Sequence, residues 1–287
     1  MPLIIDEKNL LRMRRGLRAK RLPMRPPKNE AERQMFRRMN KLWKDILFPA
    51  TEKVKKMVAE GKTPGEIADL IEEVLDTAQM QYNIASDDIV WRWLASVDKD
   101  AKMALHRGLS KSLGLEVAAI YDSPEMQFTM DKSTREAADL IKSIPREYLG
   151  RVAQAVADNM IGRLPEGRSL MDEIQRIHDV SENRARLIAR DQTNKLVGSI
   201  NKTRQESIGI EMYIWRNVQD QRVVGRPGGK YPEGNEVHGN HWIMQGLYCK
   251  WSDPTVVSYD KGKTWVPRMY EMPKTHPGED IQCRCHA

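Results

Sequence analysis

Two cysteines and a histidine lie within one short stretch near the end of the sequence, HPGEDIQCRC at residues 276 to 285. Thiolate sulfur and imidazole nitrogen are ligands that zinc prefers in proteins. Cys283 and Cys285 are separated by a single residue, and a disulfide across so small a ring would be strained. The stretch therefore indicates a metal site more than a disulfide.

Three ligands, His276, Cys283 and Cys285, would leave a tetrahedral zinc site one ligand short. An ion here would stabilise a loop-rich region that has little apolar area of its own. The alternative is that both cysteines are small buried apolar side chains and that His276 caps a turn before Pro277. Four other residues are possible fourth ligands: His238, His241, Cys249 and His286.

Sequence motifs for catalysis are sparse. HGNH at residues 238 to 241 is superficially similar to a metal nuclease motif, but no clear acidic metal pair accompanies it. The G-x-S-x-G, P-loop and G-x-G-x-x-G patterns are absent. We therefore predict no catalytic residue, and a structural or assembly protein rather than an enzyme.

The positive charge of the chain is concentrated at its N-terminus. Residues 1 to 60 hold 17 Lys or Arg and 7 Asp or Glu, a balance of +10, whereas the whole chain carries +7. We expect residues 1 to 28 to form a basic flexible arm suited to a polyanion such as DNA, or else a solvated terminus. The expected nucleic-acid-binding residues are Arg12, Arg14, Arg15, Arg18, Lys20, Arg21 and Arg25.

Apolar spacing and capping signals predict a helical bundle over residues 29 to 164. Thr63 and Glu66 form a capping box, which satisfies backbone donors at a helix start. No stretch is apolar enough for a membrane span or a signal peptide, so we expect a soluble, non-exported protein. The other expected helix starts are Asn29, Ser86 and Ser133, with breaks near Pro49 and Pro145.

The sequence changes character after about residue 165. A short helix from Ser169 and a longer one from Ser181 to Gly209 are expected, the glycine serving as a left-handed C-cap. Short β-like runs follow at MYIWRNV, GLYCKW, TVVSY and KTWVP, separated by a Gly- and Pro-rich loop. The predicted fold is α+β and mostly α: an N-terminal helical bundle, then a small C-terminal α+β domain with a short irregular β-sheet.

One face of the helix over residues 184 to 205 carries polar side chains without an acid. Two arginines and two asparagines in line could bind irregular backbone packed against the helix, or a partner. The alternative is a solvated outer face, which would usually mix acids with bases. The residues at steps of three and four are Arg190, Asn194, Val197, Asn201 and Arg204.

Taken together and in order, these motifs resemble the phage head morphogenesis family, the minor head proteins similar to the F protein of phage Mu. The resemblance spans roughly residues 165 to 287, from ARDQTNK at 189 to 195 to the terminal HPGEDIQCRC. The positions that match the family pattern are Arg190, Asp191, Thr193, Asn194, Asn201, Arg204, Trp215, Asp220, Arg222, Gly246, Trp251, Pro277 and Arg284.

The chain departs from this family pattern in one place that bears on metal binding. Many relatives carry a C-x-x-C pair soon after the Asp and Arg element, whereas this chain has no cysteine there. The best remaining candidates for a structural zinc site are His241, His276, Cys283 and Cys285.

The resemblance implies a minor head protein of a tailed phage, bound near the portal inside the capsid. Such a protein assists head morphogenesis, DNA packaging or ejection, and is found in the host cytoplasm only during assembly. The implied partners are the portal protein, packaged double-stranded DNA and, further, major capsid or scaffold protein, with no membrane. We expect residues 29 to 164 to attach to the portal and the arm to contact DNA.

Two other functions remain open from the sequence. A metal-dependent nuclease acting on phage DNA would lose cutting on His241→Ala. A nonspecific DNA-binding assembly factor would be present in empty procapsids and absent from mature particles.

Overall fold

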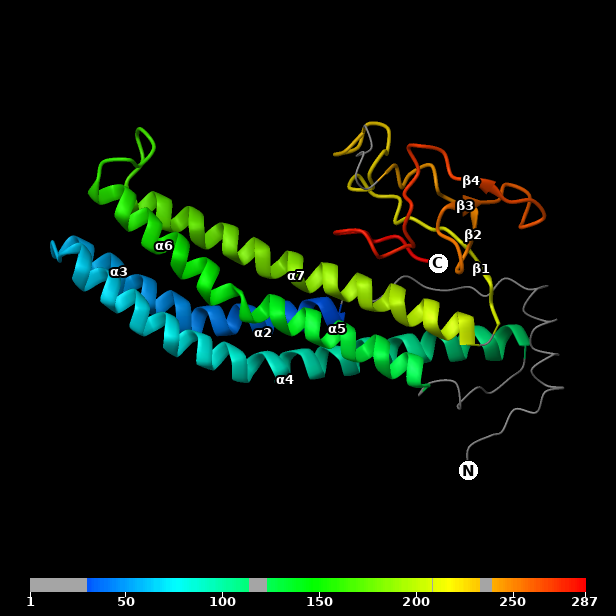
Figure 1. Ribbon diagram of the computed structural model, residues 1–287, viewed down its shortest axis with the longest axis horizontal. Helices are drawn as coiled ribbons and strands as arrows, with labels where there is room; N and C mark the ends of the chain where they lie inside the picture. Colours follow the sequence, from blue (N-terminus) through cyan, green and yellow to red (C-terminus); the bar gives the residue numbers. More distant parts are fainter. Residues whose placement is uncertain (1–29, 114–122, 208, 233–238) are drawn as a thin grey trace, which may run out of the picture. The chain divides into compact units, whose positions relative to one another are not determined.

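The structure is a computed structural model that describes residues 30–113, 123–207, 209–232 and 239–287 (Figure 1). The expected basic arm, residues 1 to 28 with the seven expected nucleic-acid-binding residues, lies outside the described residues. The described part is mostly helical, with a few short antiparallel strands near the C-terminus. This confirms the predicted α+β, mostly α, fold class.

The first described helices run without a break through Pro49. Helix α2 (Glu30–Leu42) leads into a π-helical turn, η1 (Trp43–Leu47), and then into α3 (Phe48–Ala59). Proline cannot donate a backbone hydrogen bond. In the turn before it, Phe48 N donates to Trp43 O, five residues back rather than the four of an α-helix, so the turn is wider. The predicted break at Pro49 is therefore a local widening of the helix.

Helix α4 (Pro64–Leu113) begins at the predicted capping box, because Glu66 N donates to Thr63 Oγ1 at 3.3 Å and Thr63 N to the Glu66 carboxylate at 2.9 Å. The predicted helix start at Ser86 is wrong. Ser86 is fully buried inside α4, and its hydroxyl donates to the carbonyl of Asn83.

Three further helices complete the α-helical part. Helix α5 (Pro124–Lys142) starts earlier than predicted, at the cap formed by Ser123, and α6 (Ile144–Met160) follows directly, with Pro145 in its first turn. Helix α7 (Leu170–Ser207) replaces the two helices predicted there, because Ser181 is buried within one continuous helix. Gly209 ends it with a φ of 76°, as predicted.

The strands form two small antiparallel pairs. β1 (Met212–Ile214) pairs with β2 (Tyr248–Lys250), and β3 (Val256–Val257) pairs with β4 (Val266–Pro267). A bridge between Tyr248 and Ser258 joins β2 to β3, and one between Arg216 and His286 places the C-terminal segment beside the chain that follows β1.

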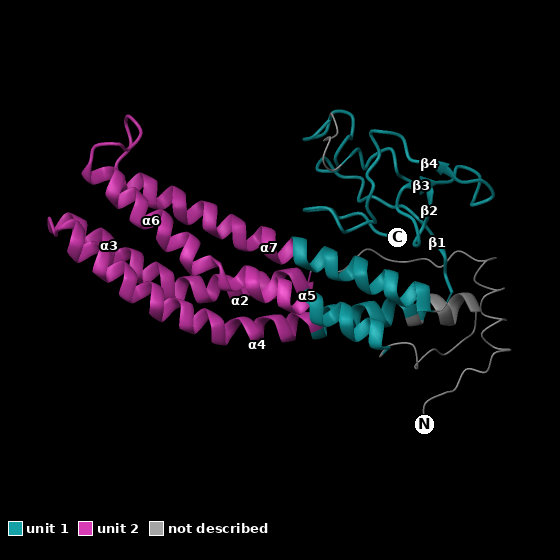
Figure 2. Cartoon of the chain, in the orientation of Figure 1, with its two compact units in different colours: residues 1–28, 95–133, 191–287 teal, residues 29–94, 134–190 magenta. Residues whose placement is uncertain are grey.

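The chain divides into two compact units whose boundaries fall inside helices (Figure 2). One unit is the helical unit, residues 29–94 and 134–190; the other is the mixed unit, which among described residues comprises 95–113, 123–133, 191–207, 209–232 and 239–287. The predicted boundary between residues 164 and 165 differs from this division, because helices α4, α5 and α7 each contribute to both units.

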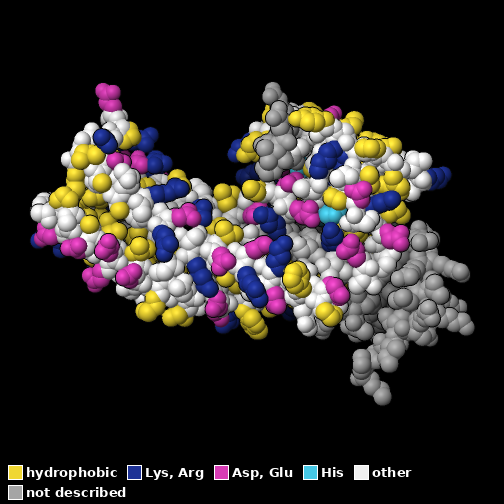
Figure 3. Space-filling view, in the orientation of Figure 1, with side chains coloured by type: hydrophobic (Ala, Val, Ile, Leu, Met, Phe, Trp, Pro, Cys, Tyr) yellow, Lys and Arg dark blue, Asp and Glu magenta, His cyan; other side chains and the backbone are white. Residues whose placement is uncertain are grey.

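Acidic and basic side chains are interspersed over the visible face of the helices (Figure 3).

Each unit has its own core. In the helical unit Met35, Met39 and Tyr148 are almost fully buried, and the Tyr148 hydroxyl lies 2.8 Å from Thr51 Oγ1. In the mixed unit the core is aromatic and sulfur-rich: Tyr213, Trp215, Met244, Cys249, Trp251, Val257, Met272, Cys283 and Cys285. Within the described residues, no helix combines the length and apolarity that a membrane crossing requires.

Candidate metal centre

Three of the four predicted metal ligands come together in the mixed unit. The Nδ1 atom of His241 lies 3.5 Å from the sulfur of Cys283 and 3.5 Å from the sulfur of Cys285. All three side chains are at least nine-tenths buried, and their ligand atoms lie within 4.8 Å of one another. This cluster could hold a metal ion.

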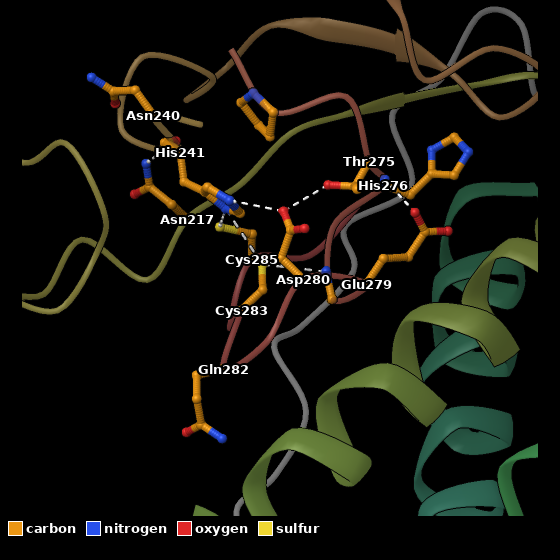
Figure 4. A network of polar contacts seen from close by, with 12 residues as sticks. Asn217, Asn240, His241, Thr275, His276, Glu279, Asp280, Gln282, Cys283 and Cys285 are labelled. Carbon is orange, nitrogen blue, oxygen red and sulfur yellow. Dashed lines mark hydrogen bonds and ion pairs between the residues drawn. The ribbon is translucent and has the colours of Figure 1, made fainter. Parts of the chain in front are cut away.

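Neighbouring groups fix the orientation of the three ligands (Figure 4). The Nε2 atom of His241 lies 3.1 Å from an Asp280 carboxylate oxygen, which also accepts a hydrogen bond from the Thr275 hydroxyl. A carboxylate bound to the far ring nitrogen is the usual second partner of a metal-binding histidine, because it fixes the tautomer. The backbone N–H of Gly278 donates to the sulfur of Cys283 at 3.4 Å.

Without metal, the electrostatics of the cluster favour a positively charged His241 beside a negatively charged Cys283. Burial lowers the pKa of His241, but hydrogen bonds and attraction from Asp280 and Cys283 outweigh burial and raise this pKa to about 10. A hydrogen bond from the Cys285 thiol, aided by His241, holds the pKa of Cys283 well below its usual value. The pKa of Cys285 is raised by the adjacent Cys283 and by burial.

His276, the fourth predicted ligand, does not join the cluster, and its assignment is corrected. Its Nδ1 atom lies 3.0 Å from the Tyr213 hydroxyl, its backbone N–H donates to Glu279, and its ring packs 5.1 Å from that of Trp251. Figure 4 shows the ring pointing away from His241. Burial, with Lys202 and Arg268 nearby, lowers the pKa of His276 to about 4, so it is a neutral core side chain.

The other possible fourth ligands divide by location. Cys249 is fully buried in the core and is not among the three clustered residues, and His286 forms the backbone bridge to Arg216. His238 lies outside the described residues. The described residues therefore bring three candidate metal ligands together.

The terminal loop, residues 276 to 285, packs closely against helix α7. A Cβ atom on Gly198 would lie 2.7 Å from the carbonyl oxygen of Pro277, and one on Gly278 would lie 2.8 Å from that of Asn194. Asp191 accepts a hydrogen bond from the backbone N–H of Gln282 at 2.7 Å. The terminal loop thus packs on α7 at Asp191, Gly198 and the backbone of Asn194. The arginines of the polar face instead bind acids of other helices, Arg190 to Glu32 and Arg204 to Asp98.

Other family-pattern residues hold the loops around the cluster. Trp215 is fully buried, its ring 5.5 Å from that of His241. Asp220 forms an ion pair with Arg284, the residue between the two cysteines, and accepts from the backbone N–H of Arg222. Gly246, with a φ of 83°, donates its N–H to the Trp215 carbonyl.

The remaining family-pattern residues stabilise helices or line a small pocket. Arg190 pairs with Glu32 at 3.3 Å in the helical unit, whereas Arg204, 1% exposed, pairs with Asp98 in the mixed unit. The Trp251 indole donates to Gln205, and Thr193 is buried. Asn194 and Asn201 line a pocket beside Cys285 and His286 that has room for roughly one water molecule.

Sequence patterns do not single out Asp280, which contacts the cluster, or Gly198, which lies against the terminal loop. In the sequence, Asp280 is one of two carboxylates in the terminal stretch. Only its position three residues before Cys283 indicates that it could lie near the cluster. Gly198 carried no signal, because a glycine inside a helix does not reveal what approaches it.

Comparisons with known proteins add one relative. No family model and no solved structure matches the chain. An uncharacterized protein of Haemophilus influenzae is 28% identical over 178 residues, which is 62% of this chain. The match spans about a third (33%) of that relative's own length.

Proposed function

We propose that the chain is a minor head protein of a tailed phage, bound near the portal inside the capsid. In this role it assists head morphogenesis and DNA packaging or ejection, without enzymatic activity. The C-terminal mixed unit is closed by one structural zinc ion, and the helical unit provides the attachment to the portal.

The observation that carries this proposal is that family-pattern residues contact the terminal motif HPGEDIQCRC from positions far away in the sequence. Asp191 of α7 binds the backbone of Gln282, and Asp220 binds Arg284, although 91 and 64 residues separate these partners. If the sequence similarities were due to chance, the residues that carry them would not be expected to contact one another. Their contacts support the view that the resemblance reflects one folded module.

The dimensions of the cluster support zinc as its metal. With zinc–sulfur and zinc–nitrogen distances of about 2.3 and 2.05 Å, tetrahedral geometry separates sulfur from nitrogen by about 3.6 Å. The observed separations between His241 Nδ1 and the two sulfurs are both 3.5 Å. Two thiolates also favour zinc over magnesium or calcium, which prefer oxygen.

The zinc has a structural role because its ligands join two distant segments of a unit with few strands. His241 lies in the loop before β2, whereas Cys283 and Cys285 belong to the C-terminal segment. An ion bound by all three would hold that segment against the core, and the binding free energy would add to folding stability.

A metal-dependent nuclease remains the second candidate, favoured by the three-ligand set. Catalytic zinc keeps an open coordination position for water or substrate. Against it, all three ligands are buried, so DNA has no direct path to the ion. The nuclease predicts divalent-metal-dependent cutting of DNA that His241→Ala abolishes and His276→Ala retains.

A deletion and complementation experiment tests the proposed function. Deleting the gene from the particle-producing gene cluster should reduce DNA-filled, infectious particles, and the intact gene should restore them. Cys283→Ser should fail to restore them, whereas Glu72→Gln, an exposed change on α4, should succeed. Normal yields of infectious particles without the gene would refute the proposal.

The proposed DNA contact of the arm has its own test. Removing residues 1 to 28 should abolish salt-sensitive retention of DNA, since the arm supplies the cations that neutralise phosphates. The circular dichroism spectrum should keep its helical signal. Unchanged DNA retention would refute the role of the arm.

A further inference from the structure

The outward side of helix α4 carries an unusual combination of apolar and acidic side chains in the helical unit. Met80, Ile84 and Trp91 are 59%, 71% and 69% exposed. At 100° per residue, Met80 and Trp91 lie within about 40° of Ile84 around the helix axis. Large apolar side chains aligned in this way are a common sign of a binding surface.

Acidic residues share this face. Residues 64 to 94 of α4 contain seven Asp or Glu and a single Arg. Asp69, Glu73 and Asp76 lie within about 80° of Ile84 around the axis, about two to four turns before it. All three are exposed and contact no cation among the described residues. In Figure 3 acidic side chains gather near the end of the helices where α4 begins.

The acids farther along α4 are already paired. Asp88 binds Arg38 of α2 and Arg92, and Asp87 lies 3.4 Å from Lys142. The α4 face, defined here as residues 69 to 91 on this side, is thus acidic toward its start and apolar toward its end. A ligand that matches it must offer both cations and apolar side chains.

The chain's own N-terminal sequence has this chemistry. Residues 10 to 25, LLRMRRGLRAKRLPMR, contain seven Arg or Lys, six Leu or Met and no acid. Every copy of the chain therefore carries both a basic, apolar segment and an acidic, apolar face. In a closed twofold dimer, the segment of each copy can bind the α4 face of the other.

We infer that the α4 face binds residues 10 to 25 of a second copy of this chain. Cations of the segment pair with Asp69, Glu73 and Asp76, and its leucines and methionines cover Met80, Ile84 and Trp91. Because DNA phosphates attract the same cations, DNA competes with the face for the segment. The inference is independent of the proposed phage function.

Sedimentation velocity of the full chain tests this inference. We expect a concentration-dependent dimer at about 50 mM salt that weakens at about 500 mM, because exposed pairs are screened. Glu73→Lys should weaken the dimer by about fivefold or more, since it replaces attraction by repulsion. Its matched control is Glu72→Lys, which makes the same charge change at an exposed neighbour about 120° away from Ile84 and should have little effect.

The apolar half has a parallel pair of variants. Ile84→Ser should weaken the dimer by about tenfold or more, as expected for a central apolar contact. Ile161→Ser, at a position 61% exposed beyond the end of α6, should leave it unchanged. Circular dichroism of all four variants should match that of the parent chain.

A labelled peptide of residues 10 to 25 identifies the occupant. It should bind the full chain, dissociate the dimer, and lose affinity with Glu73→Lys but not with Glu72→Lys. A monomer at every concentration in low salt would overturn the inference, even if the peptide binds. A dimer that is insensitive to Glu73→Lys and Ile84→Ser would overturn it equally.

Discussion

Replacing Gly198 by alanine should reverse the usual effect of a glycine-to-alanine change in a helix. Inside a helix, alanine is favoured over glycine by about 1 kcal/mol. At this position the new Cβ would lie 2.7 Å from the Pro277 carbonyl oxygen, closer than the 3.0 Å that real Cβ atoms respect. Overpacking of this kind costs about 1–3 kcal/mol, so after the helix gain we expect a net loss of up to about 2 kcal/mol.

Gly150 supplies the matched control. It lies in the exposed part of α6, and a Cβ there would meet no atom within 4 Å. Gly150→Ala should therefore stabilise the protein by about 0.5–1 kcal/mol. The two variants make the same chemical change and should differ by the overpacking cost, about 1–3 kcal/mol.

Urea unfolding followed by tryptophan fluorescence and circular dichroism measures this difference. The Gly198→Ala variant should also bind zinc more weakly, because the displaced Pro277 precedes Cys283 in the same loop. If Gly198→Ala is stabilised as much as Gly150→Ala and binds zinc normally, the terminal loop does not pack on α7 as described.

Four further predictions concern the candidate metal centre and the buried ion pair. Cys283→Ser should lose bound zinc by elemental analysis while His276→Ala retains it, and equal zinc content in both would contradict the ligand assignment. Near neutral pH zinc binding should release about two protons, from the His241 imidazolium and the Cys285 thiol, as calorimetry in buffers of different ionisation enthalpy would show. In the metal-free protein the stabilisation from charged His241 should be complete below its unfolded pKa of about 6.5 and disappear as pH rises toward about 10. Asp98→Ala should lower the free energy of unfolding by about 3 kcal/mol because it leaves Arg204 buried without this partner, and a loss below about 1 kcal/mol would show that the pair is dispensable.

Local signals in the sequence predicted helix ends where the responsible groups act within a few residues. The capping box of Thr63 and Glu66 and the left-handed Gly209 are found as expected. Ser86 and Ser181 have the same cap chemistry but lie inside helices, because both are buried and burial of the apolar neighbours along the helix decides the local structure.

The sequence predicts the residue types of the candidate metal centre but not which histidine belongs to it. Cys283 and Cys285 lie one residue apart in the sequence, and their chemistry indicated a shared ion. His276 is closer to them in sequence than His241, yet the fold brings His241 to the sulfurs and directs His276 toward the Tyr213 hydroxyl. Distance along the sequence does not determine which histidine lies beside the two sulfurs. The path of the loop depends on contacts such as that of Gly198 with Pro277.

The proposed role in the phage head is tested most directly by quantitative mass spectrometry of purified, DNA-filled particles. Copies of this chain should be counted against the subunits of the portal ring in particles and in empty procapsids. A small, reproducible number in full particles, near the portal stoichiometry or below, is the result that a minor head protein predicts. Presence in procapsids with absence from full particles would contradict it and favour the DNA-binding assembly factor.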